Sequence, residues 1–169
     1  MSRKHALTIG LALIFVVFTT VFLTGHTATP GKSHGIDYPK GWQSWSIISI
    51  SSRTDNQTMR AILGNKIAVE AAHKGQTNPW PDGTILAKVV WKTTNHETWT
   101  AAKAPGKFVH VEFMVKDSKK FAKTYGWGWA RWVGMDKKPF NDGSQICIAC
   151  HTPVKNRDWV FTNPAQLPE

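Results

Sequence analysis

The two cysteines of this 169-residue chain constrain its fold most, because they stand three positions apart and directly precede a histidine. They form Cys147-Ile-Ala-Cys-His151, the Cys-x-x-Cys-His pattern of c-type haem attachment. In that pattern both sulfurs form thioether bonds to the porphyrin, and the adjacent histidine is the proximal ligand of the iron. The chain must therefore fold around a wide, flat group, and its nine tryptophans either line that group or fill the core.

Two other uses of a Cys-x-x-Cys pair fit less well. A thioredoxin-type redox pair is expected in a βαβ context, which the sequence lacks. A zinc site needs further ligands of the right kind, and there is no third cysteine. Two cysteines also exclude a disulfide-dense secreted scaffold. The sequence therefore predicts one covalently bound haem c, attached through Cys147 and Cys150, with His151 as the iron ligand.

The position of the motif favours an open coordination site on the iron. The 18 residues after His151 contain neither histidine nor methionine, whereas small electron-transfer cytochromes carry an axial methionine downstream of the motif. Any sixth ligand must come from upstream, where the candidates are His73, His96, His110, Met59, Met114 and Met135, with His34 in the linker. Such residues are more often surface histidines or core methionines. We therefore expect gas binding or catalysis rather than electron transfer.

The start of the chain has the pattern of an export signal. A short basic stretch precedes an apolar run over residues 6–23, which predicts translocation to the periplasm. Cleavage after Ala28 fits the small-residue rule only partly, and the apolar run is about long enough to span a bilayer. Residues 1–28 are thus either a signal peptide or an N-terminal inner-membrane anchor, and residues 29–169 form one domain.

The charge of the chain is strongly basic, with 21 Lys and Arg against 11 Asp and Glu and a net charge of +10. The lysines are scattered, there is no recognised nucleic-acid motif, and the export signal also argues against nucleic acid. The charge suits either simple solubility or an acidic, soluble redox partner.

Short β-branched or alternating stretches predict a mainly antiparallel sheet. After a linker over residues 29–44, we expect strands at 45–50, 58–63, 84–91, 107–116 and 127–135, and helices at 65–74 and 117–123. Because the connections are short and no βαβ rhythm is visible, these elements predict an α+β fold with about five strands and packed helices.

The clearest alternation lies in residues 107–116. It places one set of side chains on one face, Val109, Val111, Phe113 and Val115, and a second set on the other, Phe108, His110, Glu112 and Met114.

Two charged residues interrupt apolar strand patterns, and each has an ordinary and a functional explanation. Lys88 lies on the face of Leu86 and Val90, either as a lysine that extends to solvent from a strand end or as a buried amine that can act as a nucleophile. Glu112 is either an ordinary solvent-facing residue or a carboxylate with a raised pKa that relays protons.

Several segments together resemble the cytochrome P460 family. They are Asp82-Gly-Thr-Ile-Leu-Ala-Lys88, the stretch from Val109 to Ala122, the Trp-rich strand and the terminal Cys-Ile-Ala-Cys-His, and the resemblance runs from about Tyr38 to Phe161. It implies a β-rich fold with a single haem and five-coordinate iron, and a homodimer.

The family has two branches, and the resemblance leaves both open. In the branch that oxidises hydroxylamine, a lysine bonded to the porphyrin rim matches Lys88, a distal carboxylate that assists proton transfer matches Glu112, and a distal arginine matches Arg60. The cytochromes c-prime-beta lack this cross-link, cap the iron with phenylalanines, and bind nitric oxide and carbon monoxide. The sequence favours oxidation of hydroxylamine to nitrous oxide or nitrite, with a gas-binding cytochrome as the alternative and a plain electron carrier as the least favoured class.

Overall fold

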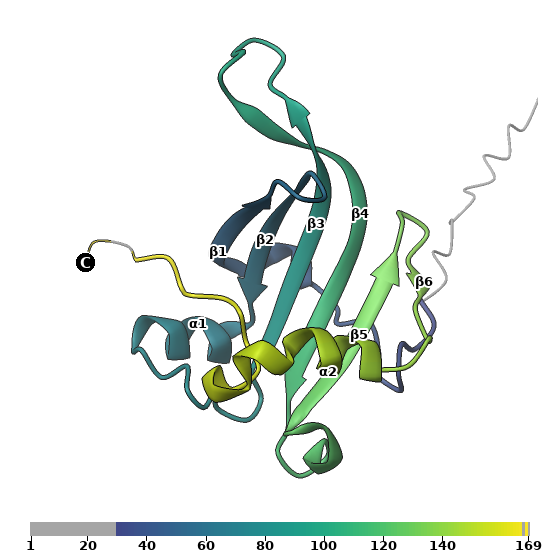
Figure 1. Cartoon of the computed structure of the whole chain (residues 1–169). Helices are drawn as coiled ribbons and strands as arrows, with labels where there is room; N and C mark the ends of the chain where they lie inside the picture. Colours follow the sequence, from purple (N-terminus) through teal and green to yellow (C-terminus); the bar gives the residue numbers. More distant parts are fainter. Residues whose placement is uncertain (1–29, 167, 169) are drawn as a thin grey trace, which may run out of the picture.

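The computed structural model describes residues 30–166 and 168, so the predicted export segment 1–28 lies outside the described residues. Six strands form one antiparallel sheet, and their order in the sheet follows their order in the chain (Figure 1). The strands are β1 (Ser46–Arg53), β2 (Thr58–Gly64), β3 (Ile85–Asn95), β4 (Lys103–Lys116), β5 (Trp127–Val133) and β6 (Lys138–Pro139).

Two α-helices and three short 3-10 helices complete the fold, which confirms the predicted α+β class. The α-helices are α1 (Lys66–His73) and α2 (Gln145–His151), and the 3-10 helices are η1 (Trp42–Ser44), η2 (Ala122–Thr124) and η3 (Thr152–Arg157). Within the described residues, no helix is both long and apolar enough to cross a membrane.

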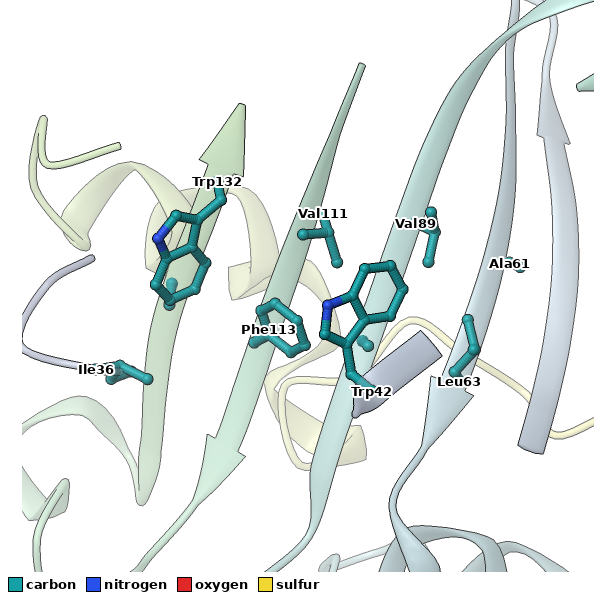
Figure 2. Packing of buried hydrophobic residues seen from close by; sticks show 10 residues of the cluster. Ile36, Trp42, Ala61, Leu63, Val89, Val111, Phe113 and Trp132 are labelled. Atoms are coloured by element: carbon teal, nitrogen blue, oxygen red, sulfur yellow. The ribbon is translucent and has the colours of Figure 1, made fainter. Parts of the chain in front are cut away.

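One face of the sheet, here called the aromatic face, carries the larger rings. Phe113 and Trp132 are 1% and 0% exposed, and their ring centroids lie 5.7 Å apart in an edge-to-face arrangement. Trp42 of η1 meets Phe113 in the same way at 5.8 Å. Figure 2 shows these rings beside the aliphatic side chains of the neighbouring strands, Ala61, Leu63, Val89 and Val111. Such rings are large, and each buries a large apolar area in this core.

The opposite face, here called the helix face, packs against α1 and α2. Helix α1 starts at Asn65, whose side-chain Oδ1 accepts hydrogen bonds from the backbone N–H of Ala68 at 3.0 Å and of Ile85 at 3.1 Å. Gly64 lets α1 approach β2, because a Cβ there would lie 2.8 Å from the Cβ of Ala68. Ile148 of α2 joins the same cluster, which includes Ile48, Leu86, Trp127, Trp129 and Trp159.

Most predicted elements are confirmed, and three details of them differ from the expectations. Residues 117–123 form a turn followed by η2 instead of one helix, because Asp117 Oδ1 binds the N–H groups of Lys119 and Lys120, and the chain turns through left-handed Tyr125 and Gly126. The strand expected over 127–135 ends at Val133. The sheet has six strands instead of about five, because β6 is only two residues long and carries no alternation to detect.

The predicted alternation of β4 holds from His110 onward but not before it. The register shifts between the pairs Val90–His110 and Trp91–Phe108, so one extra residue, Val109, bulges out of the ladder. Phe108 therefore packs with the aromatic face and not, as expected, on the side of Glu112.

Candidate functional site

Helix α2 presents the cysteines and histidine of the haem motif together. Residues three or four positions apart share one side of a helix, so Cys147 lies beside both Cys150 and His151. Both thiols are free, with Cys147 half-buried and Cys150 exposed. Ile148 anchors the helix through its buried side chain, which is 8% exposed. The two sulfurs are therefore available for thioether bonds next to the histidine.

The environment of His151 fits an iron ligand. Its Nδ1 lies 2.6 Å from the backbone oxygen of Trp159, so an Nδ1–H donated to that carbonyl leaves the Nε2 lone pair free. Burial lowers the pKa of His151, although the hydrogen bond to Trp159 raises it, and the ring remains in the neutral form that binds metals. Trp129 and Phe161 meet the imidazole edge to face, with centroids 4.7 and 5.0 Å away, and limit its rotation.

Four side chains on the helix face form what we call the Glu112 cluster: Lys88, His110, Glu112 and Arg131. Lys88, Glu112 and Arg131 are direct cross-strand partners on β3, β4 and β5. The ammonium of Lys88 and the guanidinium of Arg131 each form an ion pair with Glu112. The side chain of Glu112 is 18% exposed, so it is not the ordinary solvent-facing residue that the strand pattern also allowed.

The cations of this cluster control the charge of Glu112. Burial alone would raise the pKa of the carboxyl, but the charges of Lys88 and Arg131, with a smaller contribution from His110, outweigh it. The pKa of Glu112 therefore lies well below its usual range, whereas a raised value was one expectation from the sequence. Glu112 is a carboxylate at neutral pH and accepts hydrogen bonds.

His110 is the neutral member of the cluster. Its Nε2 lies 3.4 Å from Glu112 Oε1. Burial lowers the pKa of His110 to about 4. The charge of Glu112 opposes this shift, whereas the charges of Arg131, Lys88 and Arg60 add to it. An uncharged imidazole in contact with a carboxylate can receive a proton that the carboxylate has taken up.

Arg60 lies on the same face, one strand farther out and outside the ion pairs of the cluster. It pairs with Val90 across β2 and β3, and its Nη2 donates a hydrogen bond to Thr58 Oγ1 at 3.1 Å. Burial lowers the pKa of Arg60, while the charge of Glu112 partly offsets this effect. Its Nε is buried and has no partner among the described residues, so this N–H is free for an acceptor in the site.

The Glu112 cluster lies close enough to α2 for its charges to act on the haem motif. Burial raises the pKa of the Cys147 thiol, and the charges of Arg131, Glu112 and Lys88 modify it. A haem held by Cys147, Cys150 and His151 would therefore lie within the influence of these charges. In the described part of the chain, no group of three or more His, Cys, Asp or Glu side chains could hold a metal ion unaided.

The upstream residues considered as a sixth ligand mostly lie elsewhere. Met59 shares the aromatic face with Ala61, and Met135 is 79% exposed in a turn. His96 is in the exposed β3–β4 hairpin, and His73 ends α1. His110 and Met114 lie on the helix face, where Met114 packs against the apolar cluster. His34 Nδ1 lies 2.8 Å from the backbone oxygen of Trp129.

The comparison with protein families agrees with this geometry. Residues 39–162 match the family described as Cytochrome P460. The chain belongs to the cytochrome P460 family. As a member it is a c-type haem protein. A comparison with curated proteins finds no match.

Sequence reasoning missed Arg131 and gave His110 only as a possible iron ligand. Arg131 stands in Trp-Ala-Arg-Trp, where its aromatic neighbours dominate the pattern. A basic residue between core positions is the one signal that could have identified it. Its partner Glu112 was not predictable, because the pairing depends on the length of the turn between β4 and β5.

Proposed function

We propose that this member of the cytochrome P460 family oxidises hydroxylamine to nitrous oxide or nitrite, at one haem c bound covalently through Cys147 and Cys150 and ligated by His151. The haem iron would accept the electrons of the substrate. The observation that supports this proposal is the Glu112 cluster, since oxidation of hydroxylamine releases protons that a positioned acceptor must remove. A site that only binds a diatomic gas needs no such acceptor.

The placement of the phenylalanines also favours the oxidase over the gas binder. The resemblance implies that cytochromes c-prime-beta cap the iron with phenylalanine rings. In the described part of the chain, no phenylalanine packs over Glu112: Phe108, Phe113 and Phe121 pack on the aromatic face, Phe140 contacts Arg131, and Phe161 contacts His151. The side chains within ion-pairing distance of the Glu112 carboxylate are Lys88, His110 and Arg131.

Each member of the cluster has a part in this proposal. Glu112 accepts hydrogen bonds from the N–H or O–H groups of hydroxylamine and takes up a proton. Arg131 keeps it ionised until then, also once the ammonium of Lys88 is lost in the cross-link proposed below, and neutral His110, 3.4 Å away, receives the proton next. Arg60, with its unpartnered Nε, orients the oxygen of the substrate or of nitrite.

We further propose that Lys88 becomes bonded to the porphyrin rim, as the resemblance implies for hydroxylamine-oxidising members. Bond formation between Nζ and a ring carbon removes one hydrogen from each atom. Two electrons and two protons therefore pass to an oxidant such as hydrogen peroxide, which is reduced to water. The expected mass is about 2 Da below that of protein with haem attached only through the cysteines. Peptide mapping should place haem on the Lys88 peptide as well as on the Cys147 peptide.

The decisive experiment compares holoprotein variants in hydroxylamine turnover with a one-electron dye as acceptor, and quantifies nitrous oxide and nitrite. Glu112→Gln keeps the shape of the side chain but removes the proton acceptor, and it should lower turnover by about 10²- to 10⁴-fold with haem retained. The control is Glu70→Gln, because Glu70 is exposed on α1 and its ion pair with the exposed Lys66 is long, at 3.9 Å.

Two results would contradict the proposal. Wild-type holoprotein that never turns over hydroxylamine but binds nitric oxide or carbon monoxide would assign the chain to the gas-binding alternative. Full turnover in Glu112→Gln would remove Glu112 from the reaction.

The electrons released need an acceptor, and we propose a soluble redox partner in the periplasm that recognises the basic surface of this chain. The partner is testable by the salt dependence of its reduction rate, which should fall as ionic strength rises.

A further inference from the structure

Lys116 and Asp158 form a second ion pair, which belongs to neither the Glu112 cluster nor the haem motif. Lys116 Nζ lies 2.6 Å from Asp158 Oδ1 and 2.9 Å from Oδ2. The two side chains are 7% and 10% exposed, which makes this the most deeply buried ion pair among the described residues. A buried pair of this kind contributes little net stability over apolar side chains of the same size. Its presence therefore calls for another explanation.

Asp158 forms contacts with one loop and two strands of the sheet. Its Oδ2 also accepts a hydrogen bond from the backbone N–H of Trp80 at 2.8 Å. Its backbone oxygen accepts one from Trp127 Nε1, also at 2.8 Å. The ammonium of Lys116 in turn lies 4.9 Å from the centre of the Trp127 ring. One residue after η3 is thus attached to the loop before β3, to β4 and to β5.

The backbone at this point is strained. Asp158 has φ 50° and ψ 38°, and Trp159 follows with φ 64°. Left-handed conformation is uncommon for residues other than glycine, and two in succession persist only where surrounding contacts fix them. The contacts of Asp158 supply that restraint.

Trp159 carries the carbonyl that binds His151. Its own N–H donates to Val154 O at 3.1 Å, and its ring stacks on Tyr125 with centroids 4.1 Å apart. Its backbone oxygen lies 2.6 Å from His151 Nδ1. Only one peptide unit separates the ion-paired residue from the peptide unit that holds the imidazole, so the direction of this carbonyl depends on the conformation of Asp158.

We propose that the Lys116–Asp158 ion pair positions the carbonyl of Trp159 and thereby sets the orientation and the basicity of His151 as an iron ligand. Lys116 and Asp158 are positioning residues, since neither touches the haem motif itself. Partners of this kind, one step removed from the metal, are known to tune ligand strength. The inference does not depend on whether the site oxidises hydroxylamine or binds gas.

The test uses the iron–histidine stretching band of the ferrous holoprotein, measured by resonance Raman spectroscopy. Asp158→Asn retains an acceptor for the Trp80 N–H and tolerates the left-handed backbone, but it loses the charge. Lys116→Met keeps an apolar stem against Trp127. Both variants should shift the band to lower frequency, because a displaced carbonyl weakens the Nδ1–H hydrogen bond and the imidazole becomes a poorer donor to iron.

Two further variants separate positioning from stability. The double variant Lys116→Met/Asp158→Asn leaves no unpaired buried charge, so its melting temperature should recover relative to the single variants while the band stays shifted. Lys66→Met removes a cation from an exposed ion pair on α1 and should change neither quantity.

A wild-type stretching band in the double variant would overturn the proposal, since the pair would then serve stability alone. If a single variant fails to retain haem, the double variant still decides the question.

Discussion

On the aromatic face, Phe113 and Trp132 are 1% and 0% exposed and meet edge to face. One residue before each of them on the same strands, Glu112 and Arg131 point to the opposite face, where they are 18% and 25% exposed and form an ion pair. Alternation along β4 and β5 thus separates an apolar core from a charged site across the thickness of one backbone. The comparison indicates that stability and chemistry can be altered independently.

The elements that cover the two faces of the sheet also differ. The aromatic face is covered by η1 and the chain around it, which contribute Ile36, Tyr38, Trp42 and Trp45 to its core. The helix face is covered by the element that carries the haem motif. Substitutions of the buried rings on the first face should change unfolding, and substitutions in the Glu112 cluster should change reactivity and the response of the protein to pH.

The largest effect is expected from Phe113→Ala. Removing a fully buried ring that contacts Tyr38, Trp42 and Trp132 should lower the free energy of unfolding by about 3–5 kcal/mol. Hydroxylamine turnover per folded, haem-loaded molecule should stay at the wild-type value. Denaturant unfolding and turnover measure the two quantities. Trp99→Ala is the control, because Trp99 is 65% exposed. A loss of turnover as large as the loss of stability would break the separation between the faces.

Arg131→Met should have the next largest effect, now on reactivity. Arg131 lowers the pKa of Glu112, so its removal should raise that pKa by about 1 unit. Because Glu112 must be ionised to accept a proton, the acidic limb of the kcat/KM profile should move to higher pH by the same amount. Arg53→Met, which breaks an exposed pair with Asp55, should leave the profile in place. An unshifted acidic limb in Arg131→Met would mean that Glu112 does not govern it.

His110→Asn tests the pH dependence of stability. In the folded protein the pKa of His110 is lowered from 6.5 to about 4 by burial and by Arg131, Lys88 and Arg60, against the attraction of Glu112. Between these two pH values the unfolded chain binds a proton that the folded protein does not. The free energy of unfolding is therefore highest above pH 6.5 and falls towards pH 4, by about 3 kcal/mol at most. The variant should lose much of this slope in unfolding measured across that range. An unchanged slope would contradict the neutral state of His110.

The smallest change in stability, within about 0.5 kcal/mol, is expected from Ile50→Lys on the uncovered edge of the aromatic face. Ile50 is 70% exposed beside an open apolar groove of about 480 Å³ that Met59, Trp91 and Pro105 also line. The resemblance to the family implies a homodimer, and we propose that this groove lies in its interface. Light scattering should therefore report a dimer for the wild type and a monomer for the variant. A wild-type monomer would exclude the homodimer, and a dimeric variant would place the interface elsewhere.

Much of the sheet was predictable because local signals agree with the final structure. The alternation over residues 107–116 and the helix expected at 65–74 gave correct elements within a few residues. The errors lie where the decisive contact is not local. The bulge at Val109 reverses the side of Phe108, and only the pairing of β4 with β3 reveals it. Asp117 carries a strong helix-start signal, yet its side chain closes a turn.

Most residues of the candidate site could be identified from the sequence, but the ion pairs between them could not. Cys147, Cys150 and His151 follow from spacing alone, and Lys88 and Glu112 were identified because each interrupts an apolar strand. Their mutual ion pair depends on the register between β3 and β4, and that of Glu112 with Arg131 on the register between β4 and β5. The Lys116–Asp158 pair joins residues 42 positions apart, and no periodicity in the sequence links them.

The strand order of the sheet has a consequence for assembly. Each strand pairs with the one made before it, so the sheet can grow hairpin by hairpin through contacts that are close in sequence and form rapidly. Helix α2 follows the last strand. The apoprotein would then complete its sheet, with the Glu112 cluster in place, before the cysteines reach it. Helix α2 would then pack last, against a sheet whose charged side chains already hold their native ion pairs.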